Sequence, residues 1–331
     1  MFGSNTLEIA IGIIVVFILV STICAAIREG IEAKLKTRAA YLEQGIRQLL
    51  NDKKGNNLAL HLYKHPLING LFNNNYVPGI QNDAPELLAE GKDLPSYIPS
   101  KNFAQALIDI AVRGTDYNSK DSSTTSPVIS MENIRKNISN IDDPGIQRIL
   151  LNAVDLAQGD LNKVQANIEN WFNSGMDRVS GWYKRSTQWI ILWIGIAVSI
   201  ILNINTITIV NYLSKNEVAR KAIVEQAVVI SADSSAADSV KNNAKQMLNS
   251  MRLPIGYPEG IASVQIDAAG DVGLYNTFLG PLLGWLITAF AATLGAPYWF
   301  DILNRVMVIR STVKPHEKSR EEASQDNKSR T

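Results

Sequence analysis

The feature that most constrains this chain is one unbroken stretch from Asp160 to Leu213. Its first half is amphipathic, with apolar residues three or four positions apart, and its second half, Trp189–Val210, is apolar and long enough to cross a bilayer. No proline interrupts it, so the pattern predicts one continuous helix that leaves a soluble domain and enters a membrane. The apolar positions of the first half, which we expect to pack, include Leu161, Val164, Ile168, Trp171, Phe172, Met176, Val179 and Trp182.

A second apolar run, Ile9–Ile27, contains no charged residue and is also predicted to span the membrane. A signal peptide is the alternative, but the only charge before the run is Glu8, and the run is longer than a usual signal core. A lipoprotein site at Cys24 is excluded because Ile23, which is not small, precedes it. We therefore expect a retained membrane helix.

The third predicted span, Phe278–Ala296, carries small residues at every fourth position. Such a ridge lets another helix backbone approach closely, although small residues are common in membrane helices and chance is the competing explanation. An aromatic triplet, Tyr298–Phe300, follows the span, as is typical of the membrane interface, and precedes a short helix and a charged, disordered tail. The positions that we expect to pack are Gly280, Gly284, Thr288 and Ala292.

The outer end of the second span contains several amides and hydroxyls, which are costly in hydrocarbon and should face helices or water. They do not form a single polar stripe, and the span carries no charged residue. Hydrogen bonds to neighbouring helices are therefore favoured over a water-filled permeation path. These residues are Asn203, Asn205, Thr206, Thr208 and Asn211.

The segments between the spans also have helical signals, and none shows convincing strand alternation. Apolar residues keep helical spacing from Ile31 to Leu49, which predicts that the first helix continues to Leu50. Further helices are predicted at Lys101–Arg113 with Ser100 as cap, at Met131–Ser139, and at Pro144–Gln158 with Asp143 as cap. Two amphipathic helices are expected between Ser214 and Tyr275, and a flexible loop at Thr115–Pro127.

Basic residues decide the predicted orientation. Eleven lie near the spans on the side that holds residues 28–188 and the C-terminal tail, against three on the other side. This predicts an all-α protein with three transmembrane helices, an outside N-terminus, a cytoplasmic helical domain on two antiparallel stalks, and a small helical extracytoplasmic loop. The predicted parts are an external N-terminus (1–8), spans at 9–27, 189–210 and 278–296, a cytoplasmic domain (28–188) with stalks 28–50 and 160–188, an external loop (211–277), and an interfacial helix with cytoplasmic tail (297–331).

The composition limits the chemistry. A net charge of +1 over 331 residues leaves no basic footprint for nucleic acid, and a single cysteine excludes an intramolecular disulfide. His61 and His65 are spaced as two metal ligands would be, but no third ligand matches them, and Pro66 disfavours a helix at His65. No nucleophile motif or phosphate-binding loop is present. We therefore predict no catalytic residue, metal or cofactor.

Several blocks resemble an uncharacterised family of bacterial inner-membrane proteins. The most distinctive are WF-x4-MDRVSGWYKR from Trp171 and LGAP-x-WFD from Leu294, and the likeness covers most of the chain in the same order. The resemblance implies a location in the bacterial inner membrane, with no established activity or site residues. Members of the family often have an acidic residue where Asn205 stands, so its absence argues against an essential acid within the membrane.

Two functional hypotheses follow. The first is a non-enzymatic membrane anchor or scaffold that assembles with itself or recruits a membrane-protein partner, with membrane lipid as its surroundings. The second is an oligomeric channel or pore subunit, because three spans per chain cannot enclose a pore without several copies. The predicted stalks and the absence of charge within the spans favour the scaffold.

Overall fold

The structure is a computed structural model in which every described element is a helix, so the all-α prediction is confirmed for that part of the chain. The loop predicted at Thr115–Pro127, the helix predicted around Val240–Met251 and the tail from Lys314 lie wholly or mostly outside the described residues. The described residues are 2–73, 75–78, 86–91, 93–115, 128–232, 244, 246–248, 251, 253–256 and 280–313.

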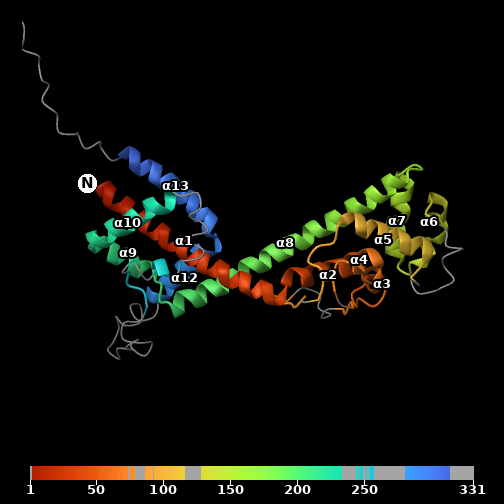
Figure 1. Cartoon of the computed structure of the whole chain (residues 1–331), viewed down its shortest axis with the longest axis horizontal. Helices are drawn as coiled ribbons and strands as arrows, with labels where there is room; N and C mark the ends of the chain where they lie inside the picture. The colour runs from red at the N-terminus through yellow and green to blue at the C-terminus, as the bar shows by residue number, and fades with distance from the viewer. Residues whose placement is uncertain are drawn as a thin grey trace, which may run out of the picture. The chain divides into compact units, whose positions relative to one another are not determined.

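The chain divides into two compact units (Figure 1). Unit 1 comprises residues 1–27 and 191–331, and unit 2 comprises residues 28–190. Two long helices, α1 (Phe2–Leu35) and α8 (Leu161–Ile201), each contribute to both units.

Helix α1 is long and apolar enough to cross a membrane by itself. Two further segments are long and apolar enough to cross a membrane only if the two helices of a bent pair are counted together. Helix α8 and α9 (Thr206–Lys215) are bent by 51°, and α12 (Gly280–Thr293) and α13 (Ala296–Val313) are bent by 95°. The described residues therefore contain one to three candidate spans.

The prediction of one continuous helix from Asp160 to Leu213 is wrong, because the helix ends at Ile201 and restarts at Thr206. Asn203 adopts the left-handed conformation (φ 48°), which asparagine tolerates better than most residues. Asn205 then caps α9 by accepting a hydrogen bond from the Thr208 backbone N–H at 3.1 Å. No proline lies in this stretch, and two asparagines break the helix instead.

The first helix also ends earlier than predicted. Lys36 is left-handed (φ 51°) and separates α1 from α2 (Thr37–Leu49). The Glu32 carboxylate accepts hydrogen bonds from the Thr37 hydroxyl and the Arg38 backbone N–H, so it supplies the cap that Lys36 cannot. The backbone N–H of Gly91 donates to the Leu35 carbonyl at 2.9 Å and satisfies the end of α1.

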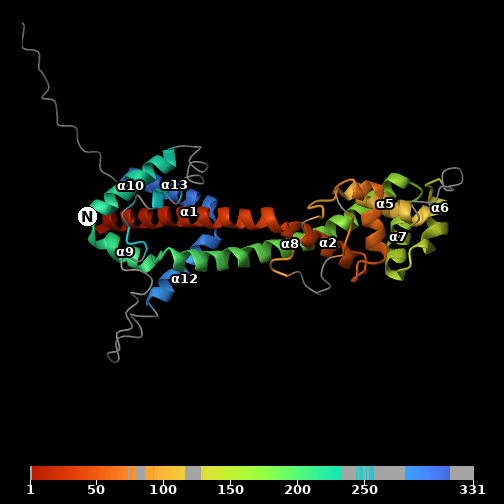
Figure 2. The ribbon, with the colours of Figure 1, turned by 60° about the horizontal axis from the view of Figure 1, so that its bottom comes forward.

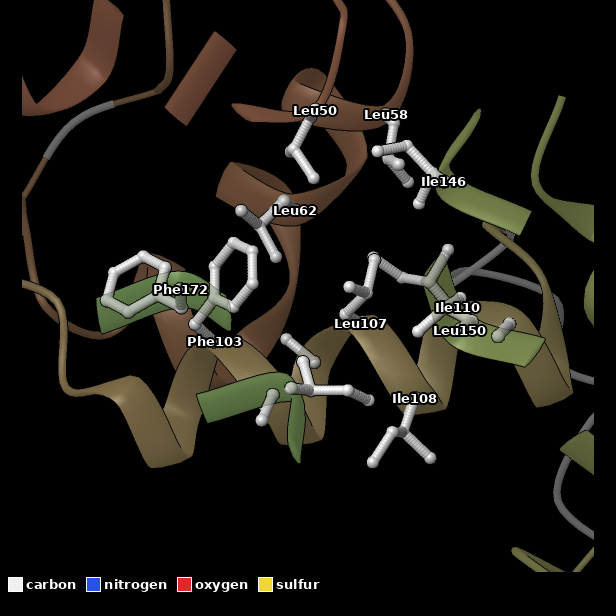
Figure 3. Close-up of a cluster of buried hydrophobic side chains, with 14 of the residues drawn as sticks. Leu50, Leu58, Leu62, Phe103, Leu107, Ile108, Ile110, Ile146, Leu150 and Phe172 are labelled. Atoms are coloured by element: carbon white, nitrogen blue, oxygen red, sulfur yellow. The ribbon is translucent and has the colours of Figure 1, made fainter. Parts of the chain in front are cut away.

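Unit 2 packs its helices around α5. Phe103 of α5 stacks on Phe172 of α8 with ring centroids 4.3 Å apart, and Leu107 and Ile108 belong to the same cluster of buried side chains (Figure 3). Asp143 caps α7 as predicted, but Ser100 is the first residue of α5 and not its cap. The remaining helices of unit 2 are α3 (Leu58–Lys64), α4 (Pro66–Asn69), α5 (Ser100–Arg113), α6 (Met131–Asn137), the 3₁₀ helix η2 (Ile138–Asn140) and α7 (Pro144–Leu156).

Helices α2 and α8 touch along their length in opposite chain directions. Their contacts step by four residues on each helix: Tyr41 lies edge-on to Tyr183, Gly45 lies against Val179, and Leu49 lies against Gly175. A Cβ on Gly45 would overlap the Val179 side chain, so glycine allows the two backbones to approach. This contact joins the two segments that the sequence analysis predicts as stalks.

Unit 1 surrounds the N-terminal part of α1 with α9, α10 (Glu217–Ala232) and α13. Gly12 of α1 faces Leu213, and the rings of Phe17 and Trp299 lie 4.7 Å apart. Helices α10 and α13 lie against each other (Figure 2). That contact was not expected, because the predicted topology assigns residues 211–277 and 297–331 to opposite sides of the membrane.

Candidate functional site

The break between α8 and α9 is the first candidate site, and we call it the polar joint (Asn203, Asn205, Thr206, Gly284, Trp285 and Thr288). The Asn203 side chain donates to the Gly256 carbonyl at 2.8 Å and accepts from the Trp285 indole N–H at 3.2 Å. The broken backbone is satisfied as well, since the Leu202 carbonyl accepts from Gly256 and the Ser199 carbonyl accepts from Ile204, both at 2.8 Å. These bonds replace those that a continuous helix would have made.

Asn205 fixes α12 against α9. It is buried, and its amide nitrogen donates to the Pro281 carbonyl at 3.1 Å while its amide oxygen caps α9. A Cβ on Gly284 would overlap this amide, and both hydrogen bonds prevent the amide from moving aside. Gly284 is therefore required by the position of Asn205.

The Thr288 hydroxyl completes the joint. It lies 2.8 Å from the Thr206 hydroxyl and 2.9 Å from the carbonyl oxygens of Ile204 and Gly284, and it is fully buried. Of the other residues predicted at this site, Ala292 is buried, the side chains of Thr208 and Asn211 are exposed, and Gly280 is the first residue of α12. Among the described groups nearby, the Ser199 hydroxyl is buried without a hydrogen-bond partner.

The second candidate is a cavity of about 460 Å³ in unit 2, which we call the α5 pocket. Helix α5 presents one face to it through Gln105, Asp109 and Arg113, which are spaced four residues apart. The first turns of α8 form another wall, and the remaining lining comes from the segment around α4 and from Ile129. The full lining is His65, Pro66, Leu67, Gln105, Ile108, Asp109, Arg113, Ile129, Leu161, Asn162 and Gln165.

Three polar side chains of this pocket form a chain of contacts. His65 Nδ1 accepts from the Leu67 backbone N–H at 3.2 Å, so its other nitrogen carries the proton and donates to Asp109 Oδ2 at 3.2 Å. Arg113 pairs with Asp109 Oδ1. The hydrogen bond from His65 and the pairing with Arg113 hold the pKa of Asp109 below its usual value, against the opposite effect of burial.

This geometry suits binding better than catalysis. Both nitrogens of His65 are engaged within the chain, so the ring cannot accept a substrate proton without losing the bond to Leu67. Among the described residues that line the pocket, none is a serine, threonine or cysteine. His61 does not line the pocket, and no group of three or more potential ligands within the described residues could hold a metal ion.

The residues predicted to pack in the stalk of α8 are divided between two environments. Most enter the core of unit 2 or lie against it, and Val179 meets Gly45. Trp182 lies beneath the Arg178 guanidinium, 5.5 Å from the ring centre. Leu161 lines the α5 pocket and is 37% exposed. The residues in or against the core are Val164, Ile168, Trp171, Phe172 and Met176.

Sequence reasoning missed a buried charged cluster in unit 2. Glu43 and Arg47 are paired at 2.8 Å with both side chains almost fully buried, and the Tyr76 hydroxyl donates to Glu43 at 2.7 Å. Arg47 also donates to the Lys53 carbonyl at 2.7 Å, and burial raises the pKa of Tyr76. The i, i+4 spacing of Glu43 and Arg47 predicts an ion pair on an exposed helix face. The pairing could therefore be predicted from the sequence, but its burial could not.

Comparison of the chain with protein-family models, with curated proteins and with solved structures yields no match. The resemblance to a family of bacterial inner-membrane proteins therefore stays a prediction.

Proposed function

We propose that this protein is a multi-pass anchor or scaffold of the bacterial inner membrane with no catalytic role. In this proposal α1, the bent pair α8–α9 and α12 cross the membrane, and unit 2 stands at the cytoplasmic face on α2 and α8 as paired stalks. Two observations support this location: α1 is long and apolar enough to cross a membrane, and the sequence resembles the family described above.

The chemistry of the polar joint carries this proposal. The side chains of Asn203, Asn205, Thr206, Trp285 and Thr288 are all neutral, and each forms a hydrogen bond to another part of unit 1. Polar groups that line a conduction path must instead exchange their partners with water or ions. The joint therefore supports a role in fixing α12 to α9 over a role in permeation.

A channel or pore subunit is the second candidate, because broken helices often line transport sites in membrane proteins. The break at residues 202–205 and the 95° bend between α12 and α13 are the observations in its favour. The two functions differ in one measurable property, which is conductance.

The deciding experiment measures ion flux through proteoliposomes that contain the purified full-length chain. The scaffold proposal expects no flux above that of empty liposomes. Replacement of Asn203 and Asn205 by leucine should leave this result unchanged. A robust conductance that shifts in either variant would establish the channel instead.

Orientation has a separate test with single cysteines in a chain in which Cys24 is replaced by alanine. We expect an impermeant thiol reagent added to intact cells to label Ser214→Cys, at an exposed position of α9, and to spare Ser174→Cys in unit 2. A third variant, Ser324→Cys, reports on the C-terminal tail, which the basic residues predict to be cytoplasmic. Labelling of Ser324→Cys would show that the C-terminal tail lies outside the cell. That result would place α13 on the same side of the membrane as α10, in agreement with the contact between the two helices.

The proposed partner is a second copy of this chain or another membrane protein. Helix α12 exposes a row of large apolar side chains, which suits lipid or a neighbouring helix. Native mass spectrometry of the purified protein would give the number of copies, and a strictly monomeric mass would restrict the scaffold role to recruitment of other proteins. The exposed residues of α12 are Leu282, Leu283, Leu286, Ile287 and Phe290, and Leu294 directly after the helix is exposed as well.

A further inference from the structure

The α5 pocket combines apolar and polar walls. Leu67 and Leu161 line it and remain 40% and 37% exposed, and Ile108, which also lines it, belongs to the buried core of unit 2. Small-molecule sites typically join apolar walls of this kind to a few fixed polar groups, in cavities of about 300–1,000 Å³. The volume of about 460 Å³ lies within that range.

The pocket contains one acidic and one basic side chain, and the two differ in how accessible they are to a ligand. Both oxygens of Asp109 are bonded within the chain, one by His65 and one by Arg113, and its side chain is 20% exposed. The Arg113 side chain is twice as exposed, at 40%. Of this ion pair, the guanidinium of Arg113 is therefore the charge more accessible to a ligand.

Arg113 is also held in a defined position. Its pairing with Asp109, which His65 holds in turn, limits the rotamers of a long side chain before any ligand arrives. Such preorganisation lowers the entropic cost of binding. Gln105 and Gln165 line the same pocket and are joined to each other by a hydrogen bond of 3.3 Å, so the pocket also contains amide groups.

We infer that the α5 pocket binds a small organic acid, with its carboxylate on Arg113 and a short aliphatic part against Leu67 and Leu161. A planar guanidinium matches a carboxylate geometrically. A doubly charged phosphate fits less well, because the guanidinium of Arg113 is already shared with Asp109.

The test uses the full-length chain in lipid nanodiscs and a butyrate capped with a trifluoromethyl group, observed by fluorine NMR. Saturable broadening of the probe signal would measure binding, and empty nanodiscs would correct for partition into lipid. The matched alcohol and amine should bind about tenfold more weakly or not at all, because they lack the carboxylate. Equal binding of the alcohol would contradict the inference.

Variants localise the site. Arg113→Gln keeps a polar side chain without the charge and should weaken the carboxylate about tenfold. Arg135→Gln is the matched control, because Arg135 also pairs with an aspartate of unit 2, Asp155, but lies outside the pocket lining. Unchanged affinity in Arg113→Gln, or an equal loss in Arg135→Gln, would overturn the assignment.

A second variant keeps the test decisive if Arg113→Gln fails to fold. Leu161→Ser changes an exposed position and removes apolar surface from the pocket. We expect it to weaken the probe about fivefold, since it withdraws roughly one kcal/mol of apolar contact. An affinity equal to that of the unaltered chain would exclude the proposed placement of the aliphatic part.

Discussion

Two helix contacts in this protein both depend on glycine, but apolar side chains pack against the glycines of the first and a polar side chain packs against the glycine of the second. Between α2 and α8 of unit 2, Gly45 receives the methyl groups of Val179 and Gly175 receives those of Leu49. Between α9 and α12 of unit 1, Gly284 receives the amide of Asn205. In the first case the close approach buries hydrocarbon, and in the second it aligns donors with acceptors.

The difference follows from the surroundings that we propose for each contact. In water, burial of apolar surface stabilises a helix pair, and methyl groups in a glycine notch contribute by that route. In a bilayer, lipid tails are as apolar as leucine, so close packing and hydrogen bonds must hold helices together. The same small residue therefore serves two sources of stability, and the two contacts should respond differently to substitution.

The largest effect is expected for Gly284→Leu. The leucine would overlap Asn205, whose two hydrogen bonds hold its amide in place, so the cap of α9 and the bond to Pro281 should both be lost. Overpacking together with the lost bonds should cost about 3 kcal/mol or more. The expected result is loss of the compact form on native gels and faster hydrogen exchange in α9 and α12. A variant that migrates and exchanges as the unaltered protein does would exclude the predicted packing of these helices.

A smaller effect is expected for Gly45→Ala, because the added methyl group overlaps Val179 while alanine favours the helix. The net loss in unfolding free energy of unit 2 should be about 1–2 kcal/mol, measured by denaturant titration of the full chain in detergent. The double variant Gly45→Ala, Val179→Ala should recover part of it by removing the overlapping atoms. Absence of any coupling between the two substitutions would show that they do not share one contact.

Thr288→Val should have an effect of about 1 kcal/mol. Valine keeps the shape of threonine but removes the hydroxyl that lies against Thr206 and the Ile204 carbonyl. The Gly284 contact should survive, so α12 should stay in place while exchange at the start of α9 increases. Thr208→Val is the control, because that side chain is exposed and only its backbone N–H joins the cap.

The smallest expected effect is a change in the pH dependence of stability, and it should appear in unit 2 only. The folded pKa of Asp109 lies below its unfolded value, first because of the bond from His65. Its contribution to stability is therefore fully present above the unfolded pKa, about 4, and is lost as pH falls through the folded value. Asp109→Asn should flatten the acid side of the stability curve of unit 2, measured by hydrogen exchange corrected for its intrinsic pH dependence.

The polar joint provides the contrast in the same experiment. Its side chains are amides, hydroxyls and an indole, none of which titrates in that range. Exchange in α9 and α12 should therefore change equally with pH in Asp109→Asn and in the unaltered chain. A difference between them there would mean that Asp109 affects more than unit 2.

The sequence by itself determined that the described part of the chain is helical and that it contains at least one apolar helix of membrane-spanning length. Periodicity is a local property of neighbouring residues, so it identified most helices, and Asp143 was recognisable as a cap because Pro144 follows it. The sequence also contained the signals for the break after α8, since Asn203 and Asn205 favour left-handed and capping conformations, although no proline marks the break.

Only the tertiary structure decided which groups meet. The contacts of Gly45 with Val179 and of Gly284 with Asn205 join residues more than seventy positions apart, and no periodicity within one helix specifies its partner. The burial of Glu43 with Arg47 and the exposure of Leu161 at the α5 pocket likewise depend on what covers each helix face. A helical pattern states that a face is apolar or polar, whereas packing determines which of its residues are covered and which are left open to a ligand.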